Sequence, residues 1–193
     1  MALDGSHSGR CWQQKPELIN FFREVIGFDR YFDGVTFTAA NQAAQAISVG
    51  LATTYTGLLL YNPVGSGVIL VPTVLKFAMS VAPAATATIG IISGYSATGG
   101  VTAETTAINV LSSQIGNTAR GRARVLSAAT IVAPVYTLQL RDGFTAAALP
   151  SPATPFDLKG LLQVLPGGFI AFGALTAITG LGSIVWLEVP LTS

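Results

Sequence analysis

Short apolar or alternating runs follow one another along most of the chain, beginning near residue 34. The runs that we expect to form strands are "QAISVGL", "TGLLLYN", "GVILVPTVLKFAMSV", "ATIGIISGY", "TAINVLSSQI", "RARVLSAATIV", "VYTLQLR", "DLKGLLQVL", "GFIAFGAL" and "GSIVWLEVPL". Turn-forming residues separate them, mainly glycine, proline, asparagine and aspartate. Short strands at this spacing, without helical segments between them, predict an all-β fold, an antiparallel β-sandwich or barrel.

The first 33 residues follow a different pattern. In "KPELINFFREVIGF" the apolar positions recur with helical spacing, and Pro16 suits a first helical turn. We therefore expect an N-terminal arm with a short amphipathic helix over 1–33, followed by a β-sandwich domain over 34–193. The apolar face of the helix, which includes Phe21 and Phe22, packs either on its own domain or on a neighbouring subunit.

The distribution of charge changes at the same boundary. Nine of the nineteen charged residues lie in the first 33 positions, and the remaining 160 residues carry only ten. A free monomer normally covers its surface with charge, so this sparse charge favours a protein that assembles with copies of itself or with a partner. The net charge of +1 provides no overall field to attract nucleic acid or an anionic membrane.

Long uncharged stretches raise the question of a membrane span. Gly34 to Leu75 and Gly160 to Leu187 are long enough, but no run of apolar residues inside them exceeds four. Frequent polar residues, glycine and proline make a transmembrane helix unfavourable. We expect no membrane helix, and the N-terminus lacks the basic-then-apolar layout of a signal peptide.

A single histidine and a single cysteine, His7 and Cys11, limit the chemistry open to the chain. Both fall in the polar N-terminal segment, where packing would not hold an imidazole beside a nucleophile. One His and one Cys also leave only carboxylates as further metal ligands. We therefore expect no cofactor, no metal and no catalysis by a serine or cysteine nucleophile.

Carboxylate pairs are the remaining catalytic possibility. A glycosidase needs two carboxyl groups on either side of the scissile bond. Glu104 with Glu188, or Asp142 with Asp157, could supply such a pair, although nothing in their spacing selects them. We expect that the protein is not an enzyme, and a carbohydrate hydrolase is the alternative.

The glycine-rich stretch "YNPVGSGVILVP" could bind a phosphate or simply join two strands. A phosphate loop needs a lysine and a helix directly after the glycines, whereas here a β-branched run follows and the next lysine is Lys76. Asn62-Pro63 would end one strand, and Gly65 and Gly67 tolerate positive φ. The stretch therefore predicts a hairpin connection.

Three arginines, Arg120, Arg122 and Arg124, form the most concentrated charge in the chain. If a strand begins at Arg120, their spacing of two places them on one side of it. That side would be a solvated, guarded sheet edge, or it would contact acidic groups on another subunit. Three basic residues in a nearly neutral chain do not favour nucleic-acid binding.

Two long segments of the β domain are rich in glycine, alanine and threonine: "TGLLLYNPVGSGVILVPTVLKFAMSVAPAATATIGI" and "LPGGFIAFGALTAITGLGSIVWLEVPL". They resemble head-decoration, or capsid cement, proteins of tailed bacteriophages, and the resemblance covers most of Thr56 to Leu191. It implies a β-sandwich, often a jelly roll, that sits on a capsid as a trimer or dimer. Such proteins have no catalytic signature, so the resemblance transfers no functional residue.

The expected function is therefore that of a virion structural protein on the outer surface of the capsid. It would be a homo-oligomer, most simply a trimer, that bridges major capsid protein subunits, with Phe21, Phe22 and the three arginines as candidate contacts. The alternative is a tail-fibre or receptor-binding β domain that recognises a host glycan in an aromatic groove. The aromatic residues available for such a groove are Tyr55, Tyr61, Tyr95, Tyr136 and Trp186.

Overall fold

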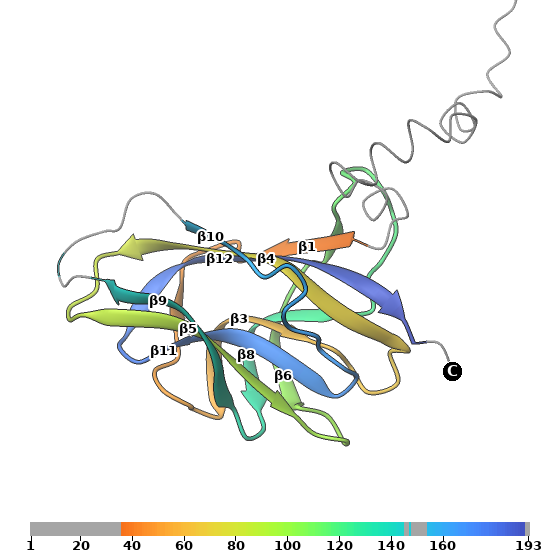
Figure 1. Cartoon of the computed structure of the whole chain (residues 1–193), viewed down its shortest axis with the longest axis horizontal. Coiled ribbons are helices and arrows are strands. Elements are labelled where there is room, and N and C mark those ends of the chain that lie inside the picture. The colour runs from red at the N-terminus through yellow and green to blue at the C-terminus, as the bar shows by residue number, and fades with distance from the viewer. Residues whose placement is uncertain (1–35, 145–146, 148–153, 192–193) are drawn as a thin grey trace, which may run out of the picture.

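The computed structural model of the chain describes residues 36–144, 147 and 154–191. These residues form two antiparallel sheets stacked face to face, and none of them is helical (Figure 1). The prediction of an all-β protein with the layers of a β-sandwich is thus confirmed. The predicted N-terminal arm, with Phe21 and Phe22, lies outside the described residues, as do His7 and Cys11.

The first sheet, sheet A, contains two long strands at its centre, β4 and β12, which pair over almost their whole length. In spatial order its strands are β10 (Thr154–Asp157), β4 (Val68–Val81), β12 (Ile178–Pro190), β1 (Thr36–Ala40) and β7 (Leu111–Ser112), and β2 (Gln45–Ile47) pairs with the early part of β12.

The second sheet, sheet B, has six strands of more even length. In spatial order they are β6 (Val101–Ile108), β8 (Arg124–Ile131), β3 (Thr54–Tyr61), β11 (Gly168–Ala174), β5 (Ala87–Tyr95) and β9 (Val135–Phe144).

Eight of these strands pair in a nested order. β1 pairs with β12, β3 with β11, β4 with β10, and β5 with β9, each time antiparallel. Strands from the beginning of the described chain thus pair with strands from its end, and the innermost pair is β5 with β9. The three strands that lie between β5 and β9 in the chain, β6 to β8, stand outside this scheme, and we refer to residues 101–131 as the β6–β8 insertion.

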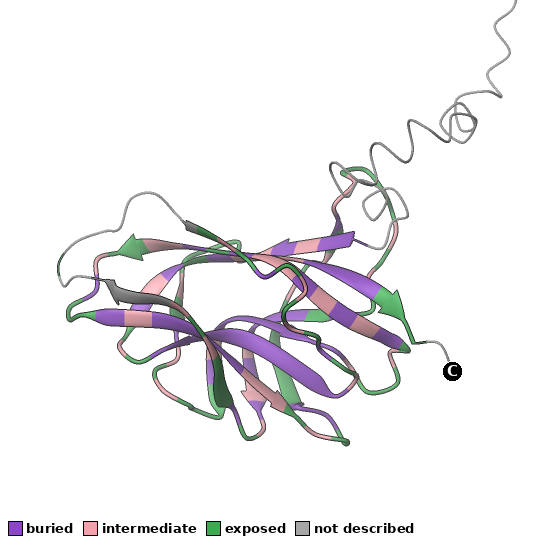
Figure 2. Ribbon diagram, viewed as in Figure 1, coloured by how far each residue is buried: buried purple, intermediate pink, exposed green. Residues whose placement is uncertain are grey.

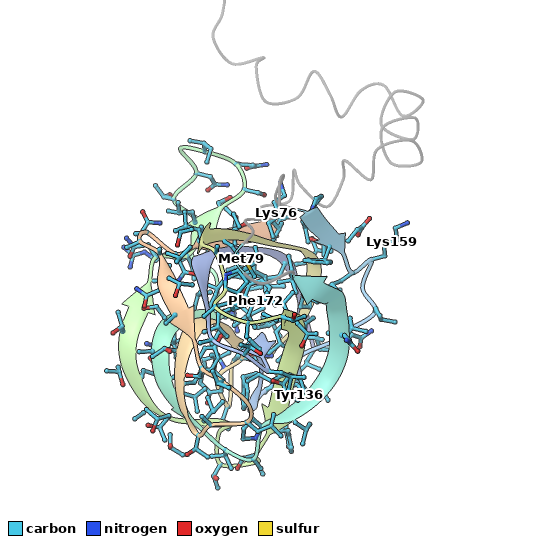
Figure 3. The ribbon with its side chains drawn as sticks, turned by 90° about the vertical axis from the view of Figure 1, so that its left-hand side faces the viewer. Lys76, Met79, Tyr136, Lys159 and Phe172 are labelled. Carbon is cyan, nitrogen blue, oxygen red and sulfur yellow. The ribbon has the colours of Figure 1, made fainter. Side chains whose placement is uncertain are left out.

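The main hydrophobic core fills the space between the two sheets (Figure 2). Aromatic residues from both sheets meet there: Phe77 of β4 and Phe172 of β11 have ring centroids 5.5 Å apart, and Phe37 lies 6.1 Å from Trp186. Figure 3 shows Phe172 inside the molecule, whereas Lys76 and Lys159 lie on its outer side. The period-2 alternation of the sequence explains this sorting of side chains.

Sheet B buries side chains on its second face as well. Tyr55, Leu59, Leu126 and Phe169 belong to a separate cluster, and each of them is almost completely inaccessible to solvent. All seven residues of β11 are buried as a result. Strands that are covered on both faces read as continuous apolar runs rather than alternating ones, which accounts for "GLLLY" and "GFIAFGA".

The turn between β3 and β4 has the backbone that its glycines predict, but it does not close a hairpin. Gly65 and Gly67 have φ of 78° and 71°. However, β3 belongs to sheet B and β4 to sheet A, so the chain crosses from one layer to the other. Buried Asn62 secures the crossing, since its Nδ2 donates to the carbonyl oxygens of Val68 and Val164, each at 2.8 Å.

One predicted strand, "DLKGLLQVL", is wrong. Only its first residue, Asp157, is in a strand, the end of β10, and Leu158–Val164 form a loop with one isolated bridge from Val164 to Leu70. Lys159 and Gly160 have φ of 46° and 77°, which is incompatible with extended backbone. Apolar residues over this stretch cover the core without joining the ladder.

Candidate interaction site

The β6–β8 insertion contains the most prominent projection of the described chain, the loop 113–123 between β7 and β8. Figure 1 shows this green loop rising beyond β1 at the margin of sheet A. Its first residue is tied to β1, because both the backbone N and the Oγ of Ser113 donate to the carbonyl oxygen of Thr36, at 3.0 and 3.1 Å. The loop therefore starts from a fixed position.

The tip of the loop is a hydrogen-bonded turn. The backbone N of Asn117 donates to the carbonyl oxygen of Gln114 at 2.9 Å, and Asn117 Nδ2 donates to Gln114 Oε1 at 2.8 Å. Gly116, at the third position of the turn, has φ of 93°, a conformation that favours glycine. This turn holds Ile115 outward with 88% of its surface exposed, the highest value among the large hydrophobic residues of the described chain.

The base of the loop is held by a buried carboxylate, that of Glu188 on β12. Its oxygens accept the backbone N–H of Arg122 at 2.8 Å and of Ala123 at 2.9 Å, and Trp186 Nε1 donates to Oε1 at 3.3 Å. Glu188 is only 6% exposed. A buried carboxylate is stable only when donors satisfy it, and here three N–H groups do so.

Gly121 permits this close approach. A Cβ atom at Gly121 would lie 2.7 Å from Glu188 Oε1 and 3.2 Å from the ring of Phe37. Any larger residue would therefore displace the carboxylate or the ring. Glycine at this position is required by packing.

The side chain of Arg122 joins the loop to the turn between β3 and β4. Its Nη1 donates to the carbonyl oxygen of Ser66 at 2.6 Å and passes close to Gly67. The glycine-rich turn thus has a structural partner, a guanidinium that packs over a residue without a side chain. Two segments far apart in sequence are linked at one end of the molecule.

The spacing of the three arginines predicted that they share one face of a strand. The structure does not place them in this way. β8 begins at Arg124, and Arg120 and Arg122 lie in the loop before it. Arg124 forms an ion pair with Glu104 of β6 at 3.1 Å, whereas Arg120 is solvent-exposed. The strand starts late because Glu188 accepts the amides of residues 122 and 123, which are then not free for a ladder.

The proposed carboxylate pairs are engaged in separate structural contacts. Glu104 pairs with Arg124 at the surface, and Glu188 holds the loop base. Asp157 Oδ1 accepts the backbone N of Lys159 at 3.1 Å, and the side chain of Asp142 lies outside the described ones. Among the described residues no group of three His, Cys, Asp or Glu side chains is arranged to bind a metal ion.

Sequence reasoning missed the role of Glu188, although a signal was present. Ile184, Trp186 and Glu188 alternate along β12, so the inward-facing register of Trp186 extends to Glu188. A carboxylate at an inward position of a strand predicts a buried acceptor that needs several N–H donors. The sequence does not reveal that these donors come from a loop 65 residues earlier in the chain.

The five aromatic residues expected to line a sugar-binding groove are not gathered in one place. Tyr55, Tyr61 and Trp186 are buried. Tyr136 lies near the margin of the molecule in Figure 3, against the backbones of Gly90 and Gly173, and partial burial raises its pKa above the usual value. Of these five residues, Tyr95 and Tyr136 are the two exposed to solvent.

Tyr95 lies beside a groove of about 420 Å³ that we name the Tyr95 groove. It is formed by the end of β5, the beginning of β9 and the loop that precedes β11. The lining residues are Ser93, Gly94, Tyr95, Ala133, Val135, Thr137, Leu162, Gln163, Val164, Leu165, Gly168, Phe169 and Ile170. None of these side chains is charged, so the groove offers apolar surface and neutral hydrogen-bonding groups.

Comparison of the chain with protein-family models, with curated proteins and with solved structures found no match. None of the described residues belongs to a helix of the length and hydropathy that a membrane span requires. The candidate site therefore rests on its own geometry. It consists of an anchored loop with an exposed isoleucine at one flank and a neutral groove at another.

Proposed function

We propose that this chain is a virion structural protein that decorates the outer surface of a tailed-phage capsid and cements neighbouring major capsid subunits. It acts as a homo-oligomer, most simply a trimer. The observation that carries the proposal is the loop 113–123, because its backbone is fixed by Glu188 while its apolar tip, Ile115, points into solvent. A fixed apolar tip is suited to contact with another protein surface.

The strand order supports a jelly roll for this protein. In a jelly roll, two Greek keys arise when one long antiparallel ribbon is wound into two sheets. Such winding pairs early strands with late ones, which is the order of β1 with β12, β3 with β11, β4 with β10 and β5 with β9. Viral capsid proteins use this architecture, as do lectins, so the strand order is consistent with a virion role.

The exposed surface supports an assembly role. Large hydrophobic residues are exposed at several places on the two sheets and their connections. They include Val49, Leu51, Val64, Val81, Leu111, Ile115, Leu165, Leu175, Leu181, Val189 and Leu191. Together with the small number of charges on the β domain, this exposed apolar surface favours a protein that is covered by its neighbours in an assembly.

A co-sedimentation experiment tests this function. The purified full chain is mixed with assembled phage heads that lack a decoration protein, and with empty liposomes as a control for non-specific adhesion. We expect saturable binding to heads and raised resistance of the heads to heating. A chain that neither binds heads nor changes their thermal stability would contradict the proposed function.

A further inference from the structure

Two exposed features of the described chain, the loop 113–123 and the Tyr95 groove, lie on opposite flanks of the sandwich. Sheet A runs from β10 to β7 and sheet B from β6 to β9, so β6, β7 and the loop 113–123 share one flank. The Tyr95 groove uses β5, β9 and Val164, which bridges to β4, and it therefore lies on the other flank. In Figure 3 the green strands of the insertion lie to the left and teal β9 to the right.

The loop flank presents an uncharged tip with one large apolar side chain, Ile115. Residues 113–119 carry no charge, and the turn at Gln114–Asn117 holds Ile115 at 88% exposure. The neighbouring strand β6 adds accessible surface, because its residues from Thr102 to Ala107 are all exposed. Since the loop is tied to both β1 and β12, ordering it on binding costs little conformational entropy.

The groove flank presents an uncharged, partly apolar surface. Tyr95, Val135 and Leu165 are 62%, 54% and 51% exposed at the groove, which is large for apolar side chains of a free protein. Ser93 and Thr137 hydroxyls, which hydrogen bond to each other, and the amide of Gln163 add neutral polar groups. A charged ligand would find no counter-charge in this lining.

We propose that Ile115 of one copy of this chain inserts into the Tyr95 groove of the next copy, so that the protein assembles head to tail. Residues 113–119 at the loop tip and the lining of the Tyr95 groove carry no charge, which matches the tip to the groove better than to a charged partner, while the exposed Arg120, Arg122 and Arg124 remain at the base of the loop. Because the tip and the groove lie on opposite flanks, each copy can donate its loop in one contact and its groove in another. Heterologous contacts of this kind close into rings when the rotation between copies allows it. This inference deepens the proposed function and rests on its homo-oligomeric part.

Single substitutions on the two flanks test the contact. Ile115→Asp places a carboxylate at the loop tip, and Leu165→Asp places one in the groove. Each is expected to raise the dissociation constant of self-association by about 10-fold or more, measured by analytical ultracentrifugation. Val81→Asp, at an exposed site in neither surface, is the matched control and is expected to assemble like the wild type. Circular dichroism checks that every variant is folded.

Mixing the two variants distinguishes a head-to-tail contact from a symmetric one. An Ile115→Asp copy retains an intact groove, and a Leu165→Asp copy retains an intact loop. An equimolar mixture is therefore expected to form a complex of one copy of each, although neither variant assembles alone. A mixture that remains monomeric, or variants that assemble as the wild type does, would overturn the inference.

A cross-link provides an independent measurement. With Cys11 replaced by serine, Ile115→Cys and Leu165→Cys in one chain place thiols on the two flanks. Oxidation is expected to yield covalent oligomers, whereas a chain with Ile115→Cys and Val81→Cys is expected to yield far fewer. Equal yields from the two chains would contradict the contact.

The outcomes separate this inference from the proposed function. A wild-type chain that stays monomeric at all concentrations contradicts the inference, while head binding is still measured separately. A variant with impaired self-association that still binds heads supports the inference and the decoration role together. Saturable glycan binding that Tyr95→Ala abolishes, with self-association unchanged, would assign the groove to a sugar and overturn the inference.

Discussion

The eight nested strands, which we call the framework, and the β6–β8 insertion differ most clearly in β11 and β6. β11, in the centre of sheet B, buries all seven of its residues, whereas β6, at the edge of the same sheet, exposes six in succession. The two strands differ in composition accordingly, "GFIAFGA" against "VTAETTAI". Within the insertion, β8 is largely buried like the nested strands, whereas β6 and the loop 113–123 present surface for contacts.

The two regions meet at Glu188. This residue belongs to β12, one of the nested strands of the framework. Its carboxylate accepts the backbone N–H groups of Arg122 and Ala123, which belong to the insertion. The loop 113–123 projects from the fold but keeps a defined shape, because its base is hydrogen-bonded to a buried carboxylate. The following substitutions test this division between framework and insertion.

The largest loss of stability is expected in the framework, from Trp186→Ala. Trp186 is fully buried between the sheets, and truncation of a buried tryptophan costs about 3–5 kcal/mol. Urea unfolding followed by circular dichroism measures the change, and Trp186→Phe should lose less. A loss below about 1 kcal/mol would show that the core between the sheets is less important than its burial implies.

A loss almost as large is expected at the junction, from Glu188→Ala. The substitution leaves the amides of Arg122 and Ala123 without their acceptor, and each buried unsatisfied group costs about 1–3 kcal/mol. Amide hydrogen exchange should accelerate in loop 113–123 more than in β11. Glu188→Gln keeps one acceptor oxygen and should be milder, and uniform exchange in both regions would contradict the anchoring role.

A smaller effect, with a distinctive pH dependence, is expected from Tyr55→Phe. The buried hydroxyl lies 2.9 Å from the carbonyl oxygen of Phe172 and 3.0 Å from that of Leu58, so its loss costs about 1 kcal/mol. Burial raises the pKa of Tyr55 well above its usual value of about 10. Its contribution is therefore complete below about pH 10 and is lost as the pH rises further.

The measurement for Tyr55 is the free energy of unfolding between about pH 8 and 11. Wild type should lose stability faster than Tyr55→Phe above about pH 10, because unfolding exposes a phenol that can then release its proton. The other tyrosines and the lysines are the same in both proteins. Subtracting one free energy of unfolding from the other at each pH therefore cancels their effect. Parallel curves would contradict the assignment.

The smallest effect on folding is expected at the tip of the insertion. Ile115→Ser removes an exposed side chain, so the free energy of unfolding of the protomer should change by less than about 0.5 kcal/mol. Gly121→Ala, six residues further along the same loop, should cost more, because the new Cβ meets the Glu188 carboxylate. Equal costs would contradict the distinction between a free tip and a packed base.

Most individual strands could be predicted from sequence because their signal is local. "TGLLLYN", "GVILVPTVLKFAMSV", "ATIGIISGY" and "GSIVWLEVPL" each contain or overlap a strand of the structure. The strand predicted from "DLKGLLQVL" failed because hydropathy does not report the positive φ at Lys159 and Gly160. The three arginines were misplaced for a different reason, since the beginning of β8 depends on a carboxylate far away in sequence.

Local sequence patterns were enough to predict that this protein is built of strands, where its glycine turns bend, and that its β domain carries little charge. These properties follow from alternation, backbone sterics and composition, all of which act within a few residues. The tertiary structure alone decided that the turn after β3 crosses between sheets, that strands pair in nested order, and that Glu188 supports the loop 113–123. Many strands of this chain have similar patterns, so the local sequence does not specify which strands pair. The pairing depends on contacts between residues far apart in the sequence, which form only when the complete chain packs.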